Sequence, residues 1–209
     1  MIDKISTYIL DNFLYKNEKI IGEQREIMLF GITRIIEDVP KYIFILLIGI
    51  IFNMLPLFAI VFVITLIYKT FVGGAHARTN ITCLIFSSVY YIIPSLIARY
   101  VNIPNNILYI VEILTFIFSL YIIIKHAPAD TEEIPILNKH KKITYKIIAI
   151  ISLVVMYIVV FLFNSNYEFA KVIILAILLT DIFATNISYK LFKCKHSYES
   201  EEFKEYYLQ

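Results

Sequence analysis

Residues 69–83 read Lys-Thr-Phe-Val-Gly-Gly-Ala-His-Ala-Arg-Thr-Asn-Ile-Thr-Cys, and this polar stretch separates two long apolar runs. The chain has 209 residues, of which 59% are hydrophobic. Soluble domains contain only about 45–50% apolar residues. The apolar runs also approach the length of about 20 residues that a helix needs to cross a bilayer. The sequence therefore predicts an all-α integral membrane protein, with residues 69–83 at one membrane face.

Six membrane spans account for the apolar runs. The first run, residues 42–70, is interrupted at Asn53 and Pro56, which favours two short helices over one long helix. A single span over this run is the alternative, and it would move every later loop to the other side. The predicted spans are 41–54, 56–72, 81–100, 105–124, 144–163 and 168–190.

The placement of lysine and arginine supports this count. With six spans, segments 1–41, 70–80, 125–143 and 190–209 lie on the same side and hold most of the basic residues. Cytoplasmic loops are enriched in Lys and Arg. We therefore expect both termini and the 70–80 break to face the cytosol.

The N-terminal segment is predicted to be amphipathic rather than spanning. Ile2, Ile5 and Ile9 fall on the same helical face, and such helices lie in the headgroup region or cover a bundle. The polar segments are too short to form a second core. We predict one domain, 1–209, made of amphipathic helices (1–40), a six-helix membrane bundle (41–190) and a cytosolic tail (191–209).

His76 and Cys83 carry the clearest chemical signal. In one continuous helix their Cα atoms would be about 10.5 Å apart, too far for a hydrogen bond between the side chains. Gly73 and Gly74 permit a bend, and Thr79 offers a cap for a new helix that begins just before Cys83. N–H groups at that helix start would stabilise a thiolate, with His76 as its base. The alternative is a packing cysteine and a solvated histidine.

The basic residues beside this pair have two interpretations each. Lys69 and Arg78 are candidates to orient a substrate carboxylate or stabilise an oxyanion, and Gly73 and Gly74 to support them. The alternative for both basic residues, favoured for Arg78, is an anchor at the membrane face. A zinc site needs three or four ligands, and no third Cys or His is near in sequence, so no metal is predicted. No basic surface with interleaved aromatic residues indicates nucleic-acid binding.

A few other polar residues lie away from this pair. Glu112 and Asp181 lie within apolar runs, where a carboxylate is a functional candidate by default and a structural hydrogen bond is an equal alternative. Cys194 is expected to have no role. His126, His140 and His196 are expected to be solvated.

Two short motifs resemble the accessory gene regulator B (AgrB) family of membrane cysteine endopeptidases. The first is Gly-Gly-Ala-His-Ala followed by Cys83, and the second is Lys-His-Ala-Pro-Ala-Asp at residues 125–130. The order of the motifs and the number of predicted spans agree with the family, so the resemblance covers nearly the whole chain. Gly73, Gly74, Pro128 and Asp130 belong to these motifs.

The resemblance implies an activity and a partner. His76 and Cys83 would be the catalytic pair of a bacterial cell-membrane enzyme that processes a quorum-sensing propeptide of the AgrD type. Cys83 would retain the N-terminal part of the propeptide as a thioester, which an internal Cys or Ser closes to a thiolactone or lactone. No cofactor is implied, and a homodimer is compatible with a bundle of this size.

Two positions depart from the family pattern. Gly31 is followed by Ile-Thr where the family often has Glu or Gln, and the loop after Asp130 reads Ile134-Pro135 where Lys-Pro is common. A second hypothesis is a small transporter or channel that uses Glu112 and Asp181. A third is a non-catalytic membrane scaffold.

Overall fold

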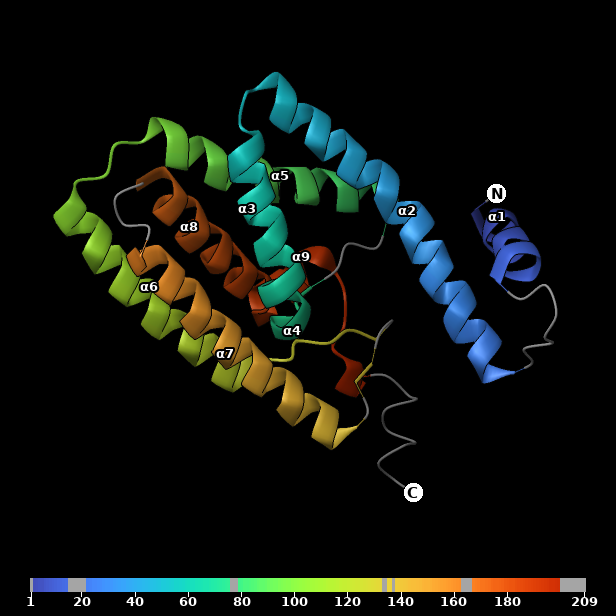
Figure 1. Cartoon of the computed structure of the whole chain (residues 1–209). Coiled ribbons are helices and arrows are strands. Elements are labelled where there is room, and N and C mark those ends of the chain that lie inside the picture. The colour runs from blue at the N-terminus through green and yellow to red at the C-terminus, as the bar shows by residue number, and fades with distance from the viewer. Residues whose placement is uncertain are drawn as a thin grey trace. The chain divides into compact units, whose positions relative to one another are not determined.

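The computed structural model describes residues 2–14, 22–75, 79–132, 135–136, 138–162 and 167–199. These residues are helical apart from short loops and isolated bridges, so the predicted all-α class is confirmed. Two compact units divide the chain, residues 1–53 and 54–209 (Figure 1). The helical elements are α1 (Ile2–Ile9), η1 (Leu10–Leu14), α2 (Glu23–Ile51), α3 (Leu55–Ile64), η2 (Thr65–Lys69), α4 (Thr70–Val72), α5 (Asn80–Tyr100), α6 (Asn105–His126), α7 (Lys139–Leu162), α8 (Tyr167–Phe183), α9 (Asn186–Phe192) and η3 (Ser197–Glu199).

The first unit consists of α1 packed against α2. The Thr33 hydroxyl donates to the fully buried Ser6 hydroxyl at 3.0 Å, and Arg25 pairs with Asp11 at 3.1 Å. α2 continues without a break through Pro40 to Ile51. The predicted boundary between an amphipathic helix and a first span near residue 41 is therefore absent, because residues 41–51 extend the same helix.

Four helical stretches of the described residues are long and apolar enough to cross a membrane. α8 and α9 add a fifth if this pair, bent by 72°, counts as one span. Five of the six predicted spans thus have a counterpart. The predicted span 41–54 has no separate counterpart, because its residues up to Ile51 are the end of α2. The number of spans and the side of the termini stay predictions. The four stretches are Leu55–Val72, Ile81–Tyr100, Asn105–His126 and Lys139–Leu162.

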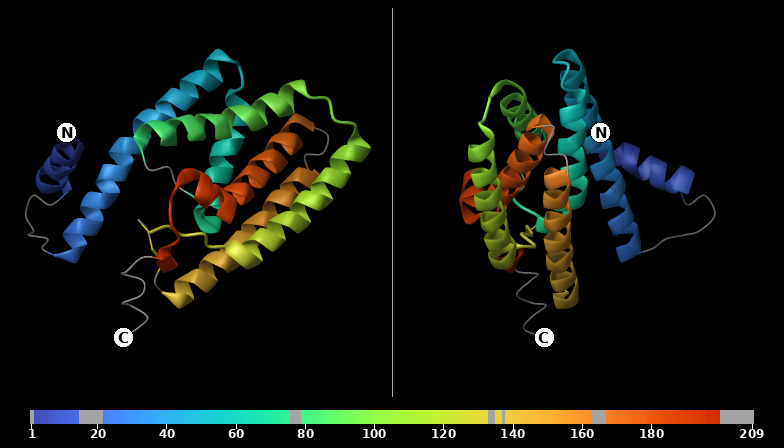
Figure 2. Two further views of the ribbon diagram at one scale, coloured as in Figure 1. Left: turned by 180° about the vertical axis from the view of Figure 1, so that it is seen from behind. Right: turned by 60° about the vertical axis from the view of Figure 1, so that its left-hand side comes forward.

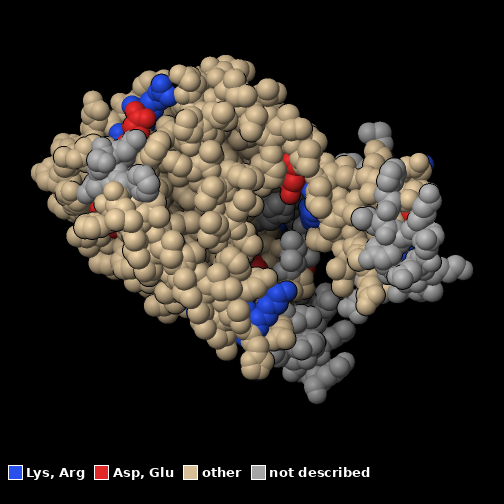
Figure 3. All heavy atoms as spheres, viewed as in Figure 1, with Lys and Arg blue, Asp and Glu red and all other residues tan. Residues whose placement is uncertain are grey.

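α8 is the central helix of the second unit. It contacts α3, α5, α6, α7 and α9, and it lies among them in both views of Figure 2. Ala170 and Ala176 are fully buried, and such small side chains let neighbouring helices approach closely. The outer faces are apolar and exposed, as at Ile113 and Phe161, and most of the surface seen in Figure 3 carries no charged side chain. This is the surface that contact with lipid tails requires.

The second unit brings three chain segments to the same end. The span that starts at Leu55 ends with a π-helical turn, η2, and the short α4. The loop after α6 and the turn between α8 and α9 lie near this end (Figure 1). π-Helical turns inside α-helices are frequent at functional sites. The candidate site is built here.

Candidate functional site

The two sequence motifs dock against each other through their backbones. Gly74 N–H donates to the carbonyl oxygen of Ala129 at 2.8 Å, and Ala129 N–H donates to that of Val72 at 2.8 Å. Ala75 N–H donates to the carbonyl oxygen of Phe183, the last residue of α8, also at 2.8 Å. The loop that leads into His76 is therefore fixed at both the 127–130 loop and α8.

The two glycines are needed for this close approach. Gly73 has a φ of 78° and Gly74 a φ of 140°, values that residues with a Cβ rarely adopt. A Cβ on Gly73 would overlap the backbone of Ala129, and a Cβ on Gly74 would lie 3.0 Å from the carbonyl oxygen of Phe183. The predicted bend at this pair is confirmed, and the structure adds its reason.

Cys83 lies in the first turn of α5, as predicted. Thr79 is the N-cap: its hydroxyl accepts from Thr82 N–H at 3.2 Å, and its N–H donates to the Thr82 hydroxyl at 3.3 Å. Cys83 N–H donates to the carbonyl oxygen of Thr79 at 2.9 Å, and the Cys83 side chain is half-buried. The reciprocal cap fixes where the helix begins, and so where the thiol stands.

His76 and Arg78 lie outside the described residues, so the approach of His76 to Cys83 stays a prediction. Both flanking segments are described. Ala75 is fixed to the end of α8, and Thr79 opens α5. The chain between them carries both His76 and Arg78.

Lys69 points towards the interior of the second unit. Its Nζ lies 4.7 Å from the centre of the Tyr90 ring and 5.4 Å from that of the Phe183 ring. It is also within electrostatic range of the Cys83 thiol. In the part of the chain that the structure describes, no carboxylate forms an ion pair with it. Aromatic faces attract a cation without neutralising it. The Lys69 amine thus faces two aromatic rings, and no described carboxylate competes for it.

Asp181 is fully buried in α8. It accepts hydrogen bonds from the Tyr68 hydroxyl at 2.7 Å and from the Ser119 hydroxyl. These bonds tie η2, α6 and α8 together at one point. One of the two predicted interpretations, a structural hydrogen bond between helices, is thus observed for Asp181. Glu112 differs, because its buried Oε1 has no hydrogen-bond partner among the residues that the structure describes.

Asp130 braces the loop of the second motif. Its Oδ2 accepts from Ile136 N–H at 3.0 Å and lies 3.5 Å from Lys142 Nζ at the start of α7. Its carbonyl oxygen accepts from the Tyr189 hydroxyl at 2.9 Å. Pro128 follows a cis peptide bond in the same loop. Both motif residues belong to the loop that receives Gly74.

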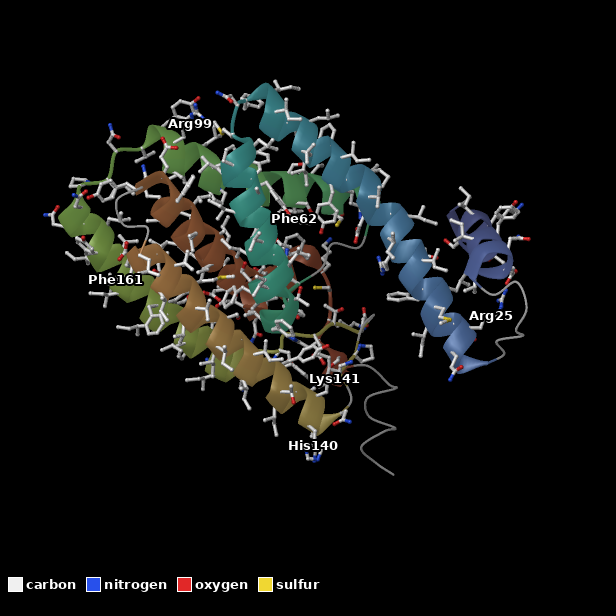
Figure 4. All side chains as sticks on the ribbon, in the orientation of Figure 1. Arg25, Phe62, Arg99, His140, Lys141 and Phe161 are labelled. Carbon is white, nitrogen blue, oxygen red and sulfur yellow. The ribbon has the colours of Figure 1, made fainter. Side chains whose placement is uncertain are left out.

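The expectation of solvated histidines is wrong for His196. Its ring stacks on Tyr189 at 3.7 Å and on Tyr198 at 5.0 Å, and its Nε2 lies 3.1 Å from Asn186 Oδ1. No pattern in the sequence indicates this stack except the spacing of His196 and Tyr198. His140, by contrast, is exposed at the start of α7 (Figure 4). Cys194 is close to the same cluster, with its thiol 3.9 Å from the Tyr189 carbonyl oxygen.

Known proteins resemble this chain over most of its length. The family model described as Accessory gene regulator B matches residues 2–185. An AgrB-like protein 2 of Clostridium perfringens strain 13 is 26% identical over 187 residues, which cover 85% of this chain and 86% of that protein. An AgrB-like protein of Clostridium beijerinckii is 33% identical over 153 residues, 73% of this chain and 74% of its own. No solved structure matches.

Proposed function

Because this chain belongs to the accessory gene regulator B family, we propose that it is a membrane cysteine endopeptidase that processes an AgrD-type propeptide. One observation carries the proposal: the Cys83 thiol stands at a capped helix start within electrostatic range of the Lys69 ammonium. A helix N-terminus and a nearby cation both favour the thiolate, which is the nucleophilic form of cysteine. A packing cysteine would need neither.

The proposed reaction has two acyl transfers. Cys83 Sγ attacks the scissile carbonyl, the thiol proton passes through His76 to the leaving amine, and the C–N bond breaks. The N-terminal part of the propeptide is then a thioester on Cys83. An internal thiol or hydroxyl of the propeptide attacks this thioester, and its proton returns to Cys83 Sγ as the C–S bond breaks. The product is a thiolactone or lactone.

Lys69 and the docked loop would have separate tasks in these steps. The Lys69 ammonium would stabilise the oxyanion of each tetrahedral intermediate or hold a substrate carboxylate. The bonds of Gly74 and Ala75 would fix the point from which the chain reaches His76. A site at the edge of an apolar bundle would limit hydrolysis of the thioester before the ring closes. The active site would face the cytosol of a bacterial cell.

The transporter hypothesis receives less support from the geometry. Both Tyr68 and Ser119 donate to Asp181, so its oxygens already have partners within the bundle. Glu112 would have to carry ion transfer without it. Flux that survives Cys83→Ala and fails with Glu112→Gln would favour the transporter.

The test is co-expression of the full chain with an AgrD-type propeptide, followed by mass spectrometry of the products. We expect Cys83→Ala and His76→Ala to abolish cleavage, and the matched Cys194→Ala variant to leave it unchanged. Membrane levels of each variant are compared by immunoblot. Cleavage that persists in a correctly inserted Cys83→Ala protein would exclude the proposed peptidase.

A further inference from the structure

A buried carboxylate anchors the turn that carries Lys69. Tyr68 directly precedes Lys69 in the π-helical turn η2, and its hydroxyl donates to Asp181 Oδ1 at 2.7 Å. The Ser119 hydroxyl donates to the other oxygen of the same carboxylate. The side chains of Tyr68, Ser119 and Asp181 are all fully buried. A carboxylate is costly to bury in an apolar bundle, and such a residue is a functional candidate by default.

The anchor controls the direction in which the Lys69 side chain leaves the turn. Neighbouring side chains of a helix leave it in different, fixed directions, so a turn that is held at Tyr68 also directs Lys69. The carbonyl oxygen of Lys69 accepts from Gly73 N–H at 2.8 Å. The Thr70 hydroxyl donates to the carbonyl oxygen of Thr65 at 3.2 Å, across the whole turn. The backbone of η2 is therefore held on both sides of Lys69.

The aromatic surface that receives the Lys69 amine is attached to the same part of α8. Lys69 Nζ lies 4.7 Å from the centre of the Tyr90 ring. The Tyr90 hydroxyl lies 2.7 Å from Thr180 Oγ1 and donates to the carbonyl oxygen of Ala176 at 3.2 Å. Thr180 directly precedes Asp181 in the chain. One turn of α8 thus fixes both the backbone before Lys69 and the ring beside its amine.

The end of α8 also fixes the other segments of the candidate site. Tyr90 belongs to α5, the helix whose first turn holds Cys83, and α5 packs against α8. Ala75 N–H, just before His76, donates to the carbonyl oxygen of Phe183 at 2.8 Å. The segments that carry the lysine, the thiol and the predicted base therefore all meet the last two turns of one helix.

The position of Lys69 matters because its amine lies within electrostatic range of the Cys83 thiol. We propose that Asp181 is a positioning residue, which holds the Lys69 amine near the Cys83 thiol through its hydrogen bond with Tyr68. The inference rests on the proposed function, because it assigns a task within that site. No ion pair joins Asp181 to Lys69 among the described residues, so the carboxylate acts through Tyr68 and not as a counter-ion. Ser119 would keep the carboxylate turned towards Tyr68.

The test measures how Cys83 reacts with a charged and an uncharged reagent. The full-length protein carries Cys194→Ala, so that only one thiol reacts, and is treated in membranes with iodoacetate or with iodoacetamide. Mass spectrometry gives both alkylation rates, and the ratio of the iodoacetate rate to the iodoacetamide rate reports the electrostatic potential at the thiol. Lys69→Gln gives the ratio without the lysine.

Two variants remove the anchor, and two others serve as controls. Tyr68→Phe deletes only the hydroxyl, and Asp181→Ala deletes the acceptor. Asp181→Asn is the conservative variant, because an amide can accept from Tyr68 and donate to Ser119. Tyr157→Phe is the matched control, since it removes another tyrosine hydroxyl of the bundle, which lies 2.7 Å from Thr115 Oγ1.

We expect Tyr68→Phe and Asp181→Ala to lower the ratio of the rates about twofold to fivefold, and Asp181→Asn and Tyr157→Phe to keep it. Removal of a negative charge at Asp181 would by itself raise the ratio, so a lower ratio reports the displacement of the lysine. In the Lys69→Gln background, neither anchor variant should lower the ratio further. A general loosening of the fold would instead change both rates alike and would act in either background.

Several results would overturn the inference. One is a ratio that Tyr68→Phe leaves unchanged or raises, and another is an equal fall in Tyr68→Phe and Tyr157→Phe. An unchanged ratio in Lys69→Gln would also overturn it, because no electrostatic effect would depend on the lysine's position. If Asp181→Ala does not reach the membrane, Tyr68→Phe decides, since it keeps the buried ring. No peptide is present in this assay, so the peptidase proposal is tested separately by Cys83→Ala processing.

Discussion

Gly74 N–H donates to the carbonyl oxygen of Ala129 at 2.8 Å, and so joins the loop before His76 to the loop after α6. The two loops are far apart in the sequence, and each carries one of the motifs that resemble the family. The docking of the two loops fixes the backbone that leads into the candidate site.

Alanine at the two glycines should therefore loosen the site. Gly73→Ala combines a positive φ with overlap against Ala129, and we expect it to lower the free energy of unfolding by about 1–3 kcal/mol. Gly74→Ala should cost less, since its Cβ would lie 3.0 Å from its nearest atom. Thermal unfolding in detergent measures both.

The chain offers a matched control in Gly31, which lies inside α2 with open space where a Cβ would be. Gly31→Ala should stabilise the protein by about 0.5–1 kcal/mol, because alanine favours the helix interior. If Gly73→Ala melted at the same temperature as the wild type, the docking would not be needed for the fold.

The Asp181 cluster predicts coupling between two buried side chains. Tyr68→Phe and Asp181→Ala each remove one partner of the 2.7 Å hydrogen bond. In a double-mutant cycle we expect a coupling free energy of about 0.5–2 kcal/mol, the usual range for such bonds between membrane helices. Unfolding in detergent gives the four stabilities. Additive effects would mean that the bond adds nothing to stability.

Lys69 should make Cys83 prefer an anionic reagent. In a Cys194→Ala background, iodoacetate carries a negative charge and iodoacetamide does not, so the ratio of their alkylation rates reports the local potential. We expect Lys69→Gln to lower this ratio about threefold to tenfold and Lys69→Arg to keep it. If Lys69→Gln left the ratio of the two alkylation rates unchanged, Lys69 would have no electrostatic influence on the Cys83 thiol.

Substitutions at Asp130 should lower the free energy of unfolding to different degrees. Asp130→Ala leaves Ile136 N–H without its acceptor and removes the contact with Lys142, at a cost of about 1–3 kcal/mol. Asp130→Asn keeps an acceptor oxygen and should cost less than half as much. Thermal unfolding measures the stability of both variants, and cleavage of the propeptide is measured in parallel. Equal costs would show that the ion pair, rather than the hydrogen bond, holds the loop.

The sequence predicted the elements that local patterns determine. The apolar runs, the turn at Asn53 and the Thr79 cap are set by neighbouring residues, and the structure confirms them. The continuity of α2 was not predicted, because its amphipathic part and its apolar part read as two separate segments. The helix also passes through Pro40, although a proline usually ends a helix.

Contacts between distant segments could not be read from the sequence. Nothing near Gly74 indicates Ala129 as its partner, and nothing near Asp181 indicates Tyr68 and Ser119, because these pairings depend on how the spans pack. The stack of His196 between two tyrosines is of the same kind. The proximity of Lys69 to Cys83 could not be predicted either, because it depends on the π-helical turn η2, which directs the lysine side chain inward.

The acyl-enzyme is the central claim, and it can be observed directly. The full-length protein is incubated in membranes with an AgrD-type propeptide, quenched in acid, digested and analysed by mass spectrometry with and without hydroxylamine, which cleaves thioesters. We predict the N-terminal part of the propeptide on Cys83, sensitive to hydroxylamine and absent from the His76→Ala protein. Cyclic product that forms without any adduct on Cys83, or an adduct on Cys194 instead, would contradict the account.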